Sequence, residues 1–245
     1  MKRLLLLIAL SFLVAGSSAK ETLKLCGVEW PPFTYVENNS IVAGLSHDII
    51  KEAFGRLDVS VVIHSIPWPR CEFYVKHGKY DAILDNSLIG DWLIKGQYPA
   101  TKYRLAVYVR DDFDQTKFSW ESLAGKTVGF VRGYDYTERI KNYRGWDKEL
   151  SSTDEQLLVK LKVKRYDYVV LDTYGAPLLA EKLNIKIRKL EPEIDSTNLY
   201  LSFNNQHTEI LKAYDEIISQ MIDDGTMDKL YLKYLPHNYT DIFKK

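Results

Sequence analysis

Two apolar stretches of the chain end abruptly in side chains that can bind a ligand. In "KYDAILDNS", Asp85, Asn86 and Ser87 follow a short apolar strand, and "RYDYVVLD" ends in Asp172. Parallel strands present ligand-binding groups just beyond their carboxyl ends. Carboxylate, amide and hydroxyl groups at such ends can hydrogen-bond a small polar or cationic molecule. The alternative is that Asp85 and Asp172 only cap the helices that follow them.

Strands and helices alternate around the first stretch, which predicts a parallel sheet with right-handed crossovers. Ser46 is the expected N-cap of the first helix, and Pro69 is expected in the first turn of the second. A hairpin-like insert with an Asn-Asn-Ser turn follows the first strand. The expected strands and helices are, in order, strand 22–28, helix 46–57, strand 59–66, helix 69–78 and strand 80–85.

A second alternation lies between two extended segments, 101–112 and 197–205. Ser152 and Glu155 form an expected capping box at the start of one of its helices. The expected elements are strand 126–131, helices 136–143 and 153–164, strand 166–172, helix 176–183 and strand 185–190, with helices 208–224 and 226–235 closing the chain.

This order of elements predicts an α/β fold with two lobes, each a mainly parallel sheet flanked by helices. The two extended segments are the expected crossings between the lobes. Lobe 1 is predicted to comprise residues 20–105 plus 200–245, and lobe 2 residues 106–199.

The N-terminus has the three parts of a secretory signal. Lys2 and Arg3 precede the apolar run "LLLLIALSFLVA", and "SSA" supplies small residues before Lys20. This run is shorter than the roughly 20 residues that span a bilayer. We therefore expect residues 1–19 to be a cleaved signal peptide and the mature protein to be exported.

Composition excludes several classes of partner. The chain has 33 basic and 33 acidic residues, and loss of Lys2 and Arg3 leaves a slight acidic excess. This balance favours neither nucleic acid nor a membrane surface as a partner. The 17 Tyr and 5 Trp can line a small-molecule site. The five His are scattered and no Cys/His cluster has metal-binding spacing, so we expect no metal and no cofactor.

The two cysteines are Cys26, at the end of the first strand, and Cys71, in the first turn of the helix after the second strand. In an exported protein an even pair favours a bridge over free thiols. If the first two strands of the α/β order are neighbours, both sulfurs lie near one sheet edge. A disulfide is the prediction, and two buried thiols are the alternative.

Five segments, in order, resemble the bacterial extracellular solute-binding proteins of family 3, the polar amino-acid type. They are "VEWPPFTYVENNSIVAGLSHDIIKEAF", "GKYDAIL", "LAGKTVGFVRG", "LKVKRYDYVVLD" and "IISQMIDDGTMDKLYLKY". Lys164 stands where that family usually has glycine. The resemblance implies a monomeric periplasmic protein with the two-lobed type II fold, which closes on its ligand and delivers it to an inner-membrane ABC transporter.

The resemblance also implies an aromatic clamp and a polar site between the lobes. Trp30 and Trp68 fall at the stacking positions, where a cationic ligand would gain about 0.5–2 kcal/mol of cation–π attraction. Core packing is the alternative for both indoles. Asp172 falls on the carboxylate that holds a ligand α-ammonium group. The other implied ligand-binding positions are Asp85, Asn86, Ser87, Gly133, Tyr134 and Asp135.

One departure from the family pattern concerns the ligand carboxylate. Members that bind α-amino acids usually hold it with an arginine shortly after the strand at 80–85, but here the run is "LIGDWLIKG", with Asp91 and no arginine. Arg70 and Arg132 are the possible replacements, and a surface role is the alternative for each. If neither points inward, the site is acidic and suits a cation without a carboxylate.

A solute-binding protein for an ABC-type importer is the leading prediction, and we expect no enzymatic activity. Its ligand is expected to be small and polar, amino-acid-like or cationic. One alternative is a periplasmic cyclohexadienyl-dehydratase-like enzyme on the same fold, which needs a positioned general acid and cations for a dicarboxylate substrate. The other alternative is a protein that presents its ligand to a membrane sensor.

Overall fold

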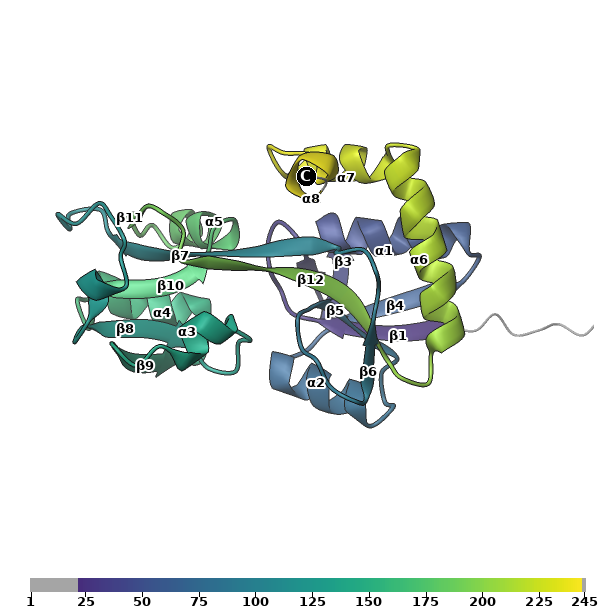
Figure 1. Cartoon of the computed structure of the whole chain (residues 1–245), viewed down its shortest axis with the longest axis horizontal. Helices are drawn as coiled ribbons and strands as arrows, with labels where there is room; N and C mark the ends of the chain where they lie inside the picture. Colours follow the sequence, from purple (N-terminus) through teal and green to yellow (C-terminus); the bar gives the residue numbers. More distant parts are fainter. Residues whose placement is uncertain (1–21, 244–245) are drawn as a thin grey trace, which may run out of the picture.

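The computed structural model describes residues 22–243, which form two α/β lobes joined by a pair of long strands (Figure 1). The expected signal peptide, residues 1–19, lies outside the described residues. No helix within residues 22–243 is long and apolar enough to cross a bilayer.

Lobe 1 is built around three parallel strands, with β1 between β4 and β5. The predicted strand-helix alternation is confirmed, because α1 and α2 connect these strands. A short hairpin, β2 and β3, continues the sheet beyond β4. The elements are β1 (Thr22–Gly27), β2 (Tyr35–Glu37), β3 (Ser40–Ala43), α1 (Leu45–Arg56), β4 (Ser60–Ser65), α2 (Trp68–Lys76) and β5 (Ala82–Asn86).

Lobe 2 repeats this design with β8 between β9 and β10, parallel to both. Its elements are the 3-10 turn η1 (Glu121–Leu123), β8 (Thr127–Val131), α3 (Glu138–Asn142), β9 (Asp147–Ser151), α4 (Asp154–Lys162), β10 (Tyr168–Asp172), α5 (Gly175–Lys182) and β11 (Ile187–Lys189). The buried strand β10 carries the apolar run "YVVL" that the sequence predicted.

Two ten-residue strands, β7 (Thr101–Arg110) and β12 (Asp195–Asn204), run between the lobes (Figure 1). They pair antiparallel with each other, from Thr101 opposite Leu199 to Leu105 opposite Asp195. At their lobe 1 end β12 pairs with β5, and at their lobe 2 end β7 pairs with β10. The predicted lobe boundaries, at 105/106 and 199/200, fall inside these two strands.

The C-terminal helices cover lobe 1. They are α6 (Thr208–Asp223), α7 (Thr226–Tyr234) and α8 (Tyr239–Phe243); α6 and α7 lie beside α1, and α8 lies against α7 (Figure 1). The buried Tyr214 of α6 stacks on Phe54 of α1, with ring centroids 5.5 Å apart. A short strand, β6 (Leu93–Lys95), pairs with β12.

Some local predictions were wrong. Ser46 does not cap α1, which begins one residue earlier after Gly44; its hydroxyl donates to Asp85 instead. The capping interaction of α4 also lies one residue later than predicted. Thr153 Oγ1 accepts from the Gln156 N–H at 3.2 Å, so Thr153, not Ser152, is the cap. The strands β6 and β9 were not anticipated, because each is short and lacks a clear apolar alternation.

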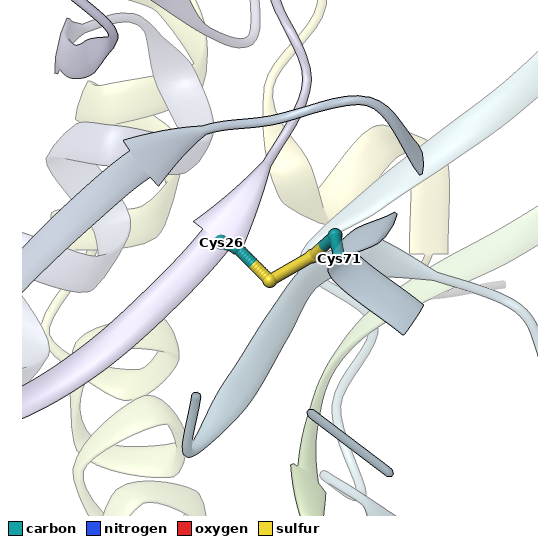
Figure 2. Close-up of a disulfide and its surroundings, with 2 residues drawn as sticks. All are labelled: Cys26 and Cys71. Atoms are coloured by element: carbon teal, nitrogen blue, oxygen red, sulfur yellow. A yellow bond between two sulfur atoms is a disulfide. The ribbon is translucent and has the colours of Figure 1, made fainter. Parts of the chain in front are cut away.

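The predicted disulfide joins Cys26, in β1, to Cys71, near the start of α2 (Figure 2). Both residues are fully buried, beside Val75 and Ile83. The parallel pairing of β1 with β4 explains the proximity, because α2 begins just after the carboxyl end of β4 and so near the end of β1. The bridge fixes the helix start to the strand end that faces the second lobe.

Candidate functional site

A cavity lies between the lobes at the carboxyl ends of their parallel strands, where the two polar strand ends were predicted to face a ligand. We call it the inner cavity. Side chains of both lobes and of the crossing strands line it: Gly27, Val28, Trp30, Thr34, Trp68, Leu84, Asp85, Ser87, Tyr103, Tyr134, Asp135, Asp154, Asp172 and Leu199.

Asp85 enters the cavity from lobe 1 on an unusual backbone. Its φ of +49° lies in the left-handed region, which a residue with a Cβ seldom adopts. Two hydroxyls hold its Oδ1: Ser46 Oγ donates at 2.9 Å and Thr101 Oγ1 at 2.8 Å. Burial raises the pKa of Asp85 to about 6, and the two hydroxyl donors oppose the rise. The residue does not cap a helix, because β5 continues into a loop.

Asp172 ends β10 on the opposite side and is 7% exposed. Its Oδ1 accepts the backbone N–H groups of Tyr174, at 2.9 Å, and Gly175, at 2.6 Å. Burial raises the pKa of Asp172 to about 6, even though these donors favour the charged form. Asp172 therefore caps the start of α5 with one of its oxygens, as the alternative proposed, but it also lines the cavity.

Gly175 marks how closely the lobes approach beside Asp172. A Cβ built at this position would lie 3.0 Å from the Pro31 carbonyl oxygen of lobe 1 and 3.0 Å from Asp172 Oδ2. Phe33 and Tyr174 meet edge to face across the same boundary, with ring centroids 5.6 Å apart. A larger residue than glycine would push the lobes apart at the cavity.

Asp154 is a third carboxylate of the cavity, and the sequence analysis missed it. It is the first helical residue of α4, and its Oδ2 accepts from the Tyr134 hydroxyl. Burial raises the pKa of Asp154, with the tyrosine bond opposing the rise. A capping box set one residue later, at Thr153 and Gln156, would have placed this carboxylate at the helix start and so beside the carboxyl ends of the strands.

Asp135 differs from the other three carboxylates because it already has a cationic partner. Its Oδ1 lies 2.5 Å from Lys141 Nζ. Its Oδ2 accepts from Ser87 Oγ at 2.6 Å, and this hydrogen bond joins lobe 1 to lobe 2. Ser87 and Asp135 both line the cavity, as the resemblance implied, but in this structure they bind each other.

Aromatic rings form much of the remaining wall. Trp30 stacks on Phe33, with centroids 4.0 Å apart, and meets Tyr103 edge to face at 5.6 Å. Trp68 lines the same cavity from the start of α2. Tyr103 was missed, because a tyrosine inside an extended strand carries no distinguishing sequence signal. The buried Trp30 indole N–H lies near Asp172 and lowers its pKa, but completes no hydrogen bond of good geometry.

Four predicted site residues lie outside the inner cavity. Asn86 is 1% exposed and bonds to Ser202 and to the Leu88 backbone, so the interior of lobe 1 occupies it. Arg70 is exposed on α2, and Gly133 is exposed opposite Pro69. Arg132 is exposed too, but it lines a wider outer cleft that opens from the cavity and is also bordered by Lys182.

The electrostatics of the inner cavity follow from these placements. Its four charged lining residues are all aspartates, and the part of the chain that the structure describes contributes no Lys, Arg or His to the lining. Within residues 22–243, no group of three or more His, Cys, Asp or Glu is placed to hold a metal ion.

Comparison with known proteins gives a consistent result. Residues 25–237 match the bacterial extracellular solute-binding proteins, family 3. The L-cystine-binding protein TcyJ of Escherichia coli (strain K12) is 22% identical over 222 residues, covering 88% of this chain and 84% of that protein. ABC transporter arginine-binding protein 1 of the same strain is 22% identical over 242 residues, covering 96% and 100%.

Among solved structures, a P235GK mutant of ArgBP from T. maritima has the same fold, with a TM-score of 0.74. It is 22% identical in sequence, and the superposition covers 87% of this chain and 94% of that one.

Proposed function

Because the chain belongs to the bacterial extracellular solute-binding proteins, family 3, we propose that its inner cavity captures a small organic cation for delivery to an inner-membrane ABC transporter. Two of the matching relatives are named for binding cystine and arginine, and both molecules carry ammonium groups. The signal-like N-terminus supports a periplasmic location for the mature protein.

One observation carries the choice of a cation. Of the four aspartates that line the cavity, Asp135 alone has an ion-pair partner among the described residues. Asp172 is buried and Asp85 and Asp154 are half-buried; none of the three has a counter-ion among the described residues, and burial raises the pKa of each. A buried carboxylate is costly unless a positive partner arrives. A cationic ligand supplies that partner as the lobes close.

The aromatic walls fit the same class of ligand. Trp30, Trp68 and Tyr103 can cover the apolar part of a ligand, and an ammonium or guanidinium group over an indole face gains cation–π attraction. A ligand carboxylate finds no guanidinium among the described residues that line the cavity. It would have to reach the outer cleft, where Arg132 and Lys182 lie. The inner cavity therefore does not require its ligand to carry a carboxylate for binding.

We propose binding without catalysis. The dehydratase alternative requires cations to hold a dicarboxylate substrate, and the described lining of the inner cavity offers only carboxylates as charged groups. Those carboxylates would repel such a substrate.

A thermal-shift screen tests the proposal. The panel contains amino acids, amines without a carboxylate and small organic acids. Each compound is used at a hundred times the weakest Kd that the screen is meant to detect. A bound ligand at that excess stabilises the protein by about 2.7 kcal/mol. We expect amines to raise the melting temperature of the wild type and to lose that effect in Asp172→Asn. A shift produced by organic acids and retained in Asp172→Asn would overturn the proposal.

A further inference from the structure

The unpaired carboxylates of the inner cavity lie at two places, not one. Asp85 projects from β5 of lobe 1, where α1 and the crossing strand β7 hold it through Ser46 and Thr101. Asp172 and Asp154 project from lobe 2, at the end of β10 and the start of α4. No three of these acidic groups converge as metal ligands would, within the described residues. The cavity thus has an acidic site in each lobe.

The charges at the two sites also act on different neighbours. Burial is the main cause of the raised pKa values of Asp172 and Tyr103; the Asp154 charge adds to both, and the Asp172 charge adds to that of Tyr103. Asp85 instead adds to the pKa of Tyr231, in helix α7 of lobe 1, which burial raises most. The pKa of Asp85 itself responds to burial and to its two hydroxyl donors. The carboxylates of the two sites therefore lie beside different aromatic residues.

Each site leaves one carboxylate oxygen available. At Asp85 both hydroxyl donors bind Oδ1, and at Asp172 both backbone donors bind Oδ1. The Oδ2 atoms accept no complete hydrogen bond from the described residues. Fixing one oxygen sets the orientation of the carboxylate and leaves the other for a donor from outside the protein. This arrangement occurs once in each lobe.

Much of the remaining lining of the cavity is apolar. Leu84, Leu199, Val28 and the rings of Trp30 and Tyr103 belong to it. Such a surface contacts methylene groups favourably. The ligand that matches this layout has a charged group at each end and a hydrocarbon middle.

We propose that the ligand is a dication: a compact molecule with two ammonium-type groups joined by a short aliphatic chain, one group at Asp85 and the other at Asp172 and Asp154. This inference rests on the proposed function and deepens it. A monocation would neutralise one site and leave the other carboxylate buried without a partner, which is the costly arrangement. Closing the lobes over a dication pairs both.

Calorimetry at pH 7.5 with matched amines tests the inference. The probes are 1,4-diaminobutane and 1,5-diaminopentane against 1-aminobutane and 1-aminopentane, which differ by one ammonium group. A hydrogen bond to a charged group is worth about 1.5–3 kcal/mol, so each diamine should bind about 10- to 100-fold more tightly than its monoamine. Asp85→Asn and Asp172→Asn should each remove most of this advantage. Asp114→Asn, an exposed carboxylate of lobe 2 away from the cavity, should keep it.

The outcomes separate this inference from the proposed function. Equal affinity for diamines and monoamines would overturn the dication and leave a cation-binding protein. Binding of organic acids with no amine bound would overturn both. If either variant fails to fold, as judged by its circular dichroism, the comparison of diamine with monoamine in the wild type still decides.

Discussion

Asp85 and Asp172 each accept hydrogen bonds from the protein at one carboxylate oxygen and at the same time line the inner cavity. Asp172 Oδ1 holds the two backbone N–H groups at the start of α5, and Asp85 Oδ1 holds the hydroxyls of Ser46 and Thr101. Such supporting bonds pre-organise a binding group and reduce the cost of ordering it when the ligand arrives. The remaining cost is that of burying the charge.

That cost predicts a pH-dependent stability in the absence of ligand. Asp172 titrates near its ordinary value of 3.8 when unfolded and at about 6 when folded. Between these values the folded state binds more protons, so the free energy of unfolding falls as pH rises from about 4 to 6. The difference between these two pKa values corresponds to roughly 3 kcal/mol. Asp172→Asn should therefore be more stable than the wild type at pH 7.5 and similar to it below pH 4.

Urea unfolding from pH 4 to pH 8 measures this difference. Asp114→Asn serves as the control, because its carboxylate is exposed and lies away from the cavity. Parallel stability curves for the wild type and Asp172→Asn would show that burial does not penalise the Asp172 charge.

For the helices and strands, the sequence predicted which elements are present and in which order better than it predicted the residues where each begins and ends. Apolar runs such as "YVVL" predicted buried strands, because a strand covered on both faces reads as continuous hydrophobicity. The start of α4 was displaced by one residue, because Ser152 and Thr153 are both good caps. Because of this one-residue error in the helix start, Asp154 was not predicted as a site residue. Ser46 was likewise predicted to cap the first helix. Its actual partner, Asp85, is 39 residues away in the sequence, and no local sequence pattern indicates a hydrogen bond between residues so far apart.

The disulfide gives a prediction at the level of these elements. Cys26 and Cys71 are separated by 45 residues, and closing a loop of that size is worth about 4 kcal/mol in the chain-entropy model. Reduction should lower the free energy of unfolding by a comparable amount. It should also weaken ligand binding, because the bridge anchors the start of α2, where Trp68 lines the cavity.

Urea unfolding and calorimetry with and without reductant measure both effects. The double variant Cys26→Ser/Cys71→Ser should match the reduced wild type and show no response to reductant. Unchanged stability on complete reduction, verified by thiol titration, would contradict the prediction.

At the scale of the whole molecule, two lobes are joined by a pair of strands, and we expect the lobes to move relative to each other. Within residues 22–243, the two lobes have separate hydrophobic clusters, and β7, β12 and contacts around the cavity connect them. Paired strands can bend and twist without losing their hydrogen bonds, so they suit a hinge. What holds the lobes together at the cavity is a small set of contacts, of which the hydrogen bond from Ser87 to Asp135 joins polar side chains.

Ser87→Ala should shift the ligand-free protein toward a more open form. The substitution removes one hydrogen bond to a charged group, worth about 1.5–3 kcal/mol, from the contacts that hold the lobes closed and from no others. The radius of gyration measured by small-angle scattering should increase. Ligand affinity should fall, since closure must then be driven by the ligand alone. The free energy of unfolding should change little, because each lobe keeps its core.

Asp135→Asn retains an oxygen that accepts from Ser87 and loses only the ion pair with Lys141, so it should remain closer to the wild type in size. An identical radius of gyration and affinity in Ser87→Ala would show that this hydrogen bond does not control closure.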